Sequence, residues 1–191
     1  TSLLVLTGCA ARAQGGFTWL NTWSGGTPTP ANVTLYPTAT TSGASPWAFR
    51  LIQGGVVEAQ TGTVIVSRPD GVLNAIYPHF SASFDFRMQG GAFTTGSPPP
   101  PGDGLSFSYG PVANGNNSRG ALGLSTGLAV QLRPRSDGSG RLDVRYNGAG
   151  IAGKDIGSDF MLWERTSPTG SRRMYLTNSP LGLSLVLARL D

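Results

Sequence analysis

The chain has 191 residues and a formal net charge of +4, with 13% charged residues, 28 glycines and 14 prolines. This length is typical of one domain with a sizeable core, and many turn-forming residues with few charges favour an all-β fold over a helical one. The basic residues are scattered, apart from Arg172–Arg173 and the trio Arg133, Arg135 and Arg141. We interpret them as a solvated face rather than a polyanion patch, and expect no nucleic-acid partner.

The first 14 residues have the features of the end of an export signal. An apolar run, Leu3–Val5, precedes the tetrapeptide Leu6–Cys9, which resembles a bacterial lipobox, where cleavage leaves a lipid-bearing cysteine. Ala11–Ala13 offers a small-x-small site for ordinary secretion, and a buried apolar start of the fold is a third reading. The run is too short to span a bilayer. We therefore expect a leader over residues 1–14 and one domain over residues 15–191, secreted or lipid-anchored through Cys9 at the bacterial cell envelope.

Short runs of strand-forming residues separated by turns fill the next part of the chain. The predicted strands are Phe17–Trp23, Val33–Tyr36, Trp47–Ile52, Val56–Ala59 and Thr63–Ser67. Gln53–Gly55 has the composition of a hairpin turn. Arg68–Gly71 is also a turn, because its proline presets φ and its glycine permits positive φ.

The clearest period in the chain is at Phe80–Met88, where apolar and polar residues alternate strictly over nine positions. Such alternation predicts a half-buried strand. Similar alternation predicts strands at Leu105–Tyr109, Leu128–Arg133 and Arg141–Tyr146. Towards the end, the candidate strands are Phe160–Arg165, Arg172–Thr177 and Leu181–Leu190. The last is almost continuously apolar, so it is either buried on both faces or belongs to a chain cut short of its partner strand.

Two neighbouring motifs carry the chemistry of the chain. Asp103 lies between Gly102 and Gly104, directly before a predicted strand, and the glycine-rich loop Ser118–Leu124 precedes the next one. A carboxylate acceptor beside exposed backbone N–H donors suits a pair of sugar hydroxyls. The alternative reading of Asp103 is a turn aspartate, since Asp-Gly is a common turn pair.

In their order, these pieces resemble the legume-type lectin and concanavalin A-like superfamily, especially its bacterial secreted members. The resemblance covers Trp47–Gly148 and rests on the segments FSASFDFRM, GDGLSFSYGP, SRGALGL, GLAVQLRP and RLDVRYNG. It implies an antiparallel β-sandwich, or jelly roll, and non-catalytic binding of a glycan or polysaccharide.

The resemblance also implies roles for individual residues. Asp103 matches the sugar-binding carboxylate, and Gly104 permits the tight backbone beside it. Gly120 and Ala121 match the two-glycine position whose N–H groups donate to the sugar, with Ala121 replacing the second glycine, and Arg119 adds a charged donor at the rim. A ring that stacks on the sugar is also expected, and the candidates are Tyr109, Tyr146 and Trp163.

The chain departs from the family at its metal site. Metal-dependent members carry a glutamate and an aspartate where this chain has Gln131 and Arg133. An amide and a guanidinium do not replace two anionic oxygens on Ca²⁺ or Mn²⁺, so no cofactor is expected. Asp137 and Asp143 are the weaker candidates for a displaced calcium site. We hypothesise that Arg133 instead forms an ion pair with Asp103.

Other functions have less support in the sequence. The glucanases of the same superfamily use carboxylates at alternate positions of one strand, whereas neither Glu58 nor Glu164 has a carboxylate two residues away, so no enzyme is expected. His79 is read as a strand-entry residue. The remaining alternative is a structural or adhesive cell-surface module that binds no sugar. The sequence leaves the sugar and the oligomeric state open.

Overall fold

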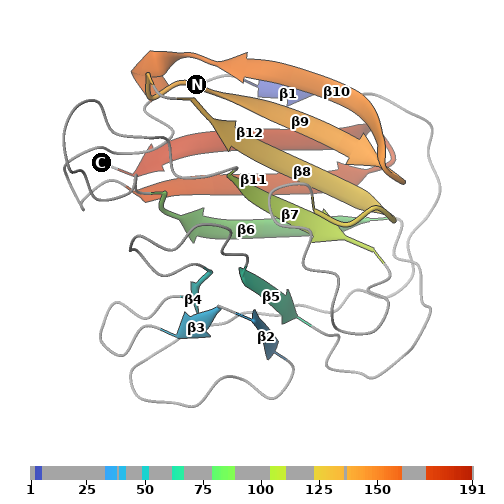
Figure 1. Cartoon of the computed structure of the whole chain (residues 1–191). Coiled ribbons are helices and arrows are strands. Elements are labelled where there is room, and N and C mark those ends of the chain that lie inside the picture. Colours follow the sequence, from blue (N-terminus) through green and yellow to red (C-terminus); the bar gives the residue numbers. More distant parts are fainter. Residues whose placement is uncertain are drawn as a thin grey trace. The chain divides into compact units, whose positions relative to one another are not determined.

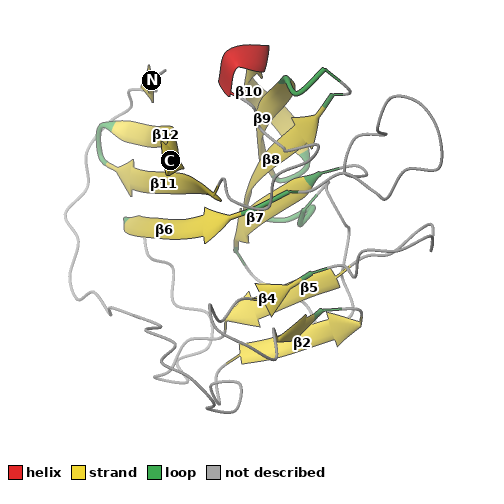
Figure 2. Cartoon of the chain, turned by 90° about the vertical axis from the view of Figure 1, so that its left-hand side faces the viewer, coloured by secondary structure: helices red, strands yellow, loops and turns green. Residues whose placement is uncertain are grey.

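The computed structural model describes residues 3–5, 33–37, 39–41, 49–51, 62–66, 79–88, 104–110, 123–135, 137–160 and 171–190. Most of these residues lie in antiparallel strands, and the helical part described is the 3-10 turn Ser158–Phe160, red in Figure 2. The prediction of an all-β chain is therefore confirmed. No helix in these ranges is long and apolar enough to cross a membrane.

The chain divides into two compact units, which are described separately. Unit 1 comprises Thr1–Leu20, Asn74–Met88 and Thr166–Asp191, and unit 2 comprises Asn21–Leu73 and Gln89–Arg165. Each unit contains one four-stranded antiparallel sheet. The predicted strands Phe17–Trp23 and Val56–Ala59 lie outside the described residues, as does most of Phe160–Arg165.

The sheet of unit 1 has the strand order β1-β12-β11-β6 (Figure 1). Its strands are β1 (Leu3–Val5), β6 (Phe80–Phe86), β11 (Ser171–Ser179) and β12 (Gly182–Leu190). The alternation seen in the sequence sends one set of side chains to a buried face, which includes Phe86, Met174 and Leu176. The intervening positions form the opposite, largely hydroxyl-bearing face.

Two expectations about this sheet need correction. The apolar strand β12 is not buried on both faces: Leu183, Leu185 and Leu187 are buried, but the residues between them are half-exposed, and β12 has partners on both sides in β11 and β1. Arg172 is not part of a solvated face, because it shares the buried face with Met174 and is only 1% exposed. The apolar alternation of β11 carries its side chain inward.

The sheet of unit 2 has the strand order β10-β9-β8-β7 (Figure 1). Its strands are β7 (Leu105–Tyr109), β8 (Leu128–Pro134), β9 (Gly140–Tyr146) and β10 (Ala149–Ile156). The first three coincide with predicted strands. Val130, Leu132, Leu142 and Val144 line one face and are at most 4% exposed, which makes this face the core side of the sheet.

Strand β10 was not expected, because its sequence contains two glycines and no continuous apolar alternation. It forms because Asn147 and Gly148, with φ values of 48° and 80°, make a two-residue turn that returns the chain antiparallel to β9. Two residues with positive φ are what the tightest hairpin turn requires, and Asn-Gly is its preferred sequence.

Unit 2 also contains two short strand pairs. β2 (Val33–Pro37) pairs with β5 (Gly62–Val66). These two strands correspond to the predicted strands Val33–Tyr36 and Thr63–Ser67. β3 (Thr40–Thr41) pairs with β4 (Phe49–Arg50), so the described part of Trp47–Ile52 finds its partner upstream in the chain.

Candidate functional site

The position directly before strand β7 accommodates only glycine. Gly104 has a φ of +112°, and a Cβ atom there would lie 1.9 Å from the carbonyl oxygen of Leu132 on β8. Both the backbone angle and the close approach of the two strands exclude a side chain. The second glycine of the Gly-Asp-Gly motif is thus required by the fold, and Asp103 directly precedes it in the sequence.

The end of the glycine-rich loop lies against the same strand. Gly123 is buried with a φ of +68°, and a Cβ atom on it would lie 2.7 Å from Ser108 Oγ and 3.3 Å from Ser106 Cβ. The next residue, Leu124, donates its N–H to Ser108 Oγ over 3.0 Å. The loop therefore reaches β8 across the face of β7 that carries its serines.

A reciprocal pair of hydrogen bonds ties the chain after this loop to the turn between β9 and β10. Gly127 donates its N–H to Asn147 Oδ1, and Asn147 donates its N–H to the Gly127 oxygen, both over 2.9 Å. Arg145 then donates from Nε to the oxygen of Gly148 over 3.1 Å. These hydrogen bonds fix the loop end against the β9–β10 turn.

The register of the four strands collects polar residues on the face opposite the core. One row across β7, β8, β9 and β10 consists of Ser106, Gln131, Asp143 and Gly153. The next row contains Arg133, Arg141 and Asp155. We call this the polar face of unit 2.

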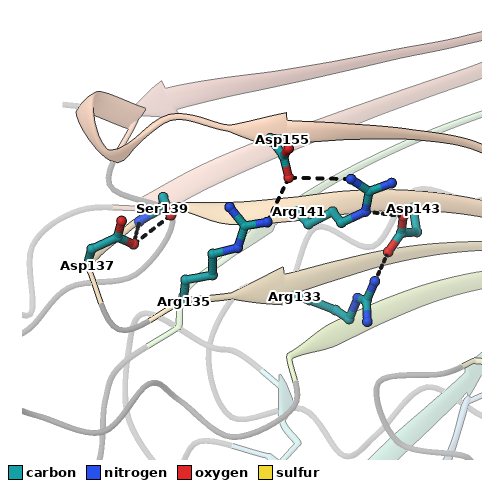
Figure 3. A network of polar contacts seen from close by, with 7 residues as sticks. All are labelled: Arg133, Arg135, Asp137, Ser139, Arg141, Asp143 and Asp155. Carbon is teal, nitrogen blue, oxygen red and sulfur yellow. Dashed lines mark hydrogen bonds and ion pairs between the residues drawn. The ribbon is translucent and has the colours of Figure 1, made fainter.

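An ion-pair network occupies this face (Figure 3). Asp143 receives Arg133 Nη2 at 2.5 Å from β8 and Arg141 Nε at 2.8 Å from its own strand, so each carboxylate oxygen holds one guanidinium. Asp155 on β10 receives Arg135 Nη2 at 2.8 Å and Arg141 Nη1 at 3.4 Å. The network runs over three strands, with Asp143 as its most enclosed carboxylate at 16% side-chain exposure.

These contacts change the acidity of the charged groups. Burial acts to raise the pKa of Asp143, but the hydrogen bonds and charges of Arg133 and Arg141 outweigh it, and the pKa is lower than usual. The hydrogen bond to Asp143 raises the pKa of Arg141. Asp143 and Arg141 are therefore both charged at neutral pH.

Asp137 has a separate, local role. Its Oδ1 accepts the N–H of Ser139 over 2.9 Å and the Ser139 hydroxyl over 2.5 Å, in the turn between β8 and β9. The side-chain hydrogen bond from Ser139 and then the backbone one lower the pKa of Asp137. The two weaker calcium candidates thus have different partners, Asp137 in a turn and Asp143 in the network. In the ranges that the structure describes, no three His, Cys, Asp or Glu residues group to hold a metal.

The sequence-predicted site residues fall into two sets. Gly104, Gln131, Arg133, Asp137 and Asp143 are described, and Gln131 and Arg133 occupy alternate positions on the polar face as expected. The other set lies outside the described residues and comprises Cys9, Asp103, Arg119, Gly120, Ala121 and Trp163. The hypothesis of an Arg133–Asp103 pair stays a prediction, and the described partner of Arg133 is Asp143.

The two described aromatic candidates, Tyr109 and Tyr146, do not lie on the polar face. Tyr109 and Tyr146 are both in register with Leu128, on the face that carries Val130 and Val144. Tyr146 is 54% exposed at the end of β9. Sequence analysis missed Asp155 and Arg135 as partners of each other, because their contact depends on the unexpected strand β10. The signal was present as Asn147–Gly148, the turn that brings Asp155 beside Arg141.

Comparisons of the chain with protein-family models, with curated proteins and with solved structures found no match.

Proposed function

We propose that this protein binds carbohydrate without catalysis, as an exported domain with a concanavalin A-like sandwich fold. In support of that fold, each unit has a four-stranded antiparallel sheet with one buried apolar face. The observation that carries the function is the meeting of two motifs on one strand: Gly104 opens β7, and Gly123 and Leu124 lie against Ser106 and Ser108 two and four residues later.

The proposed chemistry divides acceptors from donors. Asp103, next to Gly104, accepts two sugar hydroxyls, and the backbone N–H groups at Gly120 and Ala121 donate to sugar oxygens. Arg119 adds a donor at the rim. From Gly104 to Ser106 the extended chain rises about 7 Å, and this short spacing of the two motifs along β7 supports a site built from both.

The proposed site works without a bound cation. The oxygens of Asp143 already hold Arg133 and Arg141, and Arg133 supplies a positive charge where metal-dependent members of the family that the sequence resembles carry a metal ligand. The loop end is held by the Leu124–Ser108 and Gly127–Asn147 hydrogen bonds. Calcium removal is therefore expected to leave the geometry of the loop end unchanged.

A glycan array with the full chain tests the proposal. Wild-type protein is compared with Asp103→Asn, which keeps the shape of the side chain but removes the anionic acceptor. Asp137→Asn is the matched control, because asparagine keeps an acceptor oxygen for Ser139. Binding that is lost only in Asp103→Asn supports the site. Absence of binding by wild-type protein with a folded circular dichroism spectrum favours a structural or adhesive module.

A further inference from the structure

The hydroxyl-bearing face of the unit 1 sheet is a second polar surface, built from strands of unit 1 alone. Ser83 on β6 is in register with Tyr175 on β11, and Ser81 is in register with Thr177. All four side chains belong to exposed residues, and Tyr175 is 42% exposed. We call this surface the Tyr175 platform.

A shallow depression of about 210 Å³ lies on the platform. It is lined by Ser81, Ser83, Tyr175 and Thr177, and by Ala82 and Leu176, which lie between them in the sequence. Pockets that enclose a small ligand usually measure roughly 300–1,000 Å³. A depression this small and open suits one unit of an extended ligand that lies across the strands.

An ion pair lies beside the ring, and its two charges neutralise each other. Arg173 donates to both oxygens of Asp85, from Nε over 2.5 Å and from Nη2 over 2.8 Å. Its Cζ atom lies 6.0 Å from the centre of the Tyr175 ring, at the outer limit of a cation–π contact. The platform thus presents an oriented ring beside two charges that neutralise each other.

We propose that the Tyr175 platform binds a neutral polysaccharide chain. The C–H face of a sugar stacks on the exposed ring, while the hydroxyls of Ser81, Ser83 and Thr177 exchange hydrogen bonds with sugar hydroxyls. The paired charges favour an uncharged ligand over a polyanion. Ser81, Ser83 and Thr177 give the ring polar neighbours on β6 and β11, while Val186 is its neighbour on β12. Hydroxyls beside a ring favour a sugar over a lipid or an apolar protein surface.

Sedimentation binding to microcrystalline cellulose and to chitin tests the proposal, with charged alginate for comparison. Wild-type protein is expected to bind at least one neutral polymer and to prefer it to alginate. Tyr175→Ala is expected to weaken that binding about tenfold, because the stacking surface is lost. Tyr175→Phe keeps the ring and is expected to stay within about threefold of wild type.

Two control variants separate this surface from the proposed Asp103 site. Tyr146→Ala removes another exposed ring, from unit 2, and is expected to leave cellulose or chitin binding unchanged, as is Asp103→Asn. The proposal is overturned if wild type binds neither neutral polymer or if Tyr175→Ala binds as wild type does. It is also overturned if sedimentation velocity shows a wild-type dimer that Tyr175→Ala dissociates, since a second copy then covers the face. If Asp103→Asn loses cellulose or chitin binding while Tyr175→Ala keeps it, the polymer binds at the Asp103 site. That result would refute binding at the Tyr175 platform and would support the proposed function.

Discussion

Gly153 on β10 lies directly opposite Asp143 on β9, and a Cβ atom on this glycine would lie 2.7 Å from Asp143 Oδ1 and 2.5 Å from Arg141 Nη2. The missing side chain therefore leaves the space in which the two charged groups meet. This relationship explains why a strand with weak β propensity belongs to the site: its glycine admits the ion pair, and its Asp155 extends the network.

Gly153→Ala is expected to break the Arg141–Asp143 contact. Gly150→Ala is the matched control, because it lies in the same strand and has no atom within 4 Å of the added Cβ. Replacing glycine by alanine at an open position stabilises a protein by roughly 0.4–1 kcal/mol, because it reduces the conformational entropy of the unfolded chain. We expect Gly153→Ala to be about 1 kcal/mol less stable than Gly150→Ala in urea unfolding. Equal unfolding midpoints would show that the ion pair contributes nothing.

Asp143→Asn is expected to lower the free energy of unfolding by about 1–2 kcal/mol at pH 7, since two charge-assisted hydrogen bonds are weakened. The pKa of Asp143 is lowered in the folded state, so its contribution is present above the unfolded pKa of about 3.9 and is lost as pH falls through the folded pKa. The difference in stability between variant and wild type should therefore shrink as the pH falls below about 3.9. A difference in the free energy of unfolding that stays the same from pH 7 down to the lowest pH at which the protein is folded would assign the effect to packing.

A double-mutant cycle that combines Arg133→Gln with Asp143→Asn isolates the interaction between these two side chains. The coupling energy between Arg133 and Asp143 is expected to be about 0.5–1 kcal/mol and to shrink at high salt, because the Arg133 side chain is 52% exposed. A coupling that is zero at low salt would mean that the guanidinium does not hold Asp143.

Gly104→Ala is expected to destabilise the protein by more than about 2 kcal/mol, because positive φ and the contact with the Leu132 oxygen both oppose a side chain. Gly148→Ala is the control: its φ is also positive, at +80°, but its nearest neighbour is 3.5 Å away. It should cost about 1 kcal/mol from backbone strain alone. Thermal or urea unfolding of both variants measures the difference, and equal losses would contradict the close approach of β7 and β8.

The lipobox-like sequence predicts processing at Cys9. When the gene is expressed with its export signal in a bacterium that matures lipoproteins, the mature chain is expected to start at Cys9 and to incorporate labelled fatty acid. Cys9→Ser should abolish the label. Mass spectrometry of the N-terminus distinguishes this outcome from cleavage after Ala13, which would indicate ordinary secretion, and from an unprocessed chain that retains Leu3–Val5 as β1 beside β12.

Alternation in the sequence was sufficient to find the strands that have one buried face. Phe80–Phe86 and Leu128–Pro134 are examples, because the period of two follows from burial of every second side chain. Strand β10 was missed since its own side chains carry no period, and its position depends on the Asn147–Gly148 turn and on pairing with β9. Propensity along one strand does not contain that information.

The candidate site was predictable only in part, for a related reason. The spacing of Gln131 and Arg133 predicted that they share one face of β8, and the register between the strands places both on the polar face. The partner of Arg133 was not predictable, because the contact with Asp143 depends on the register between β8 and β9. Likewise, Tyr175 becomes a candidate only when β6 brings Ser81 and Ser83 beside it.

Isothermal titration calorimetry with a glycan identified on the array, performed in calcium and again after exhaustive chelation, tests whether the protein binds sugar at Asp103 without a metal. Wild-type protein is expected to show the same Kd in both conditions, and Asp103→Asn is expected to give no measurable heat. Binding that disappears on chelation and returns with calcium would contradict the metal-independent site, and equal binding by Asp103→Asn would contradict its location at β7.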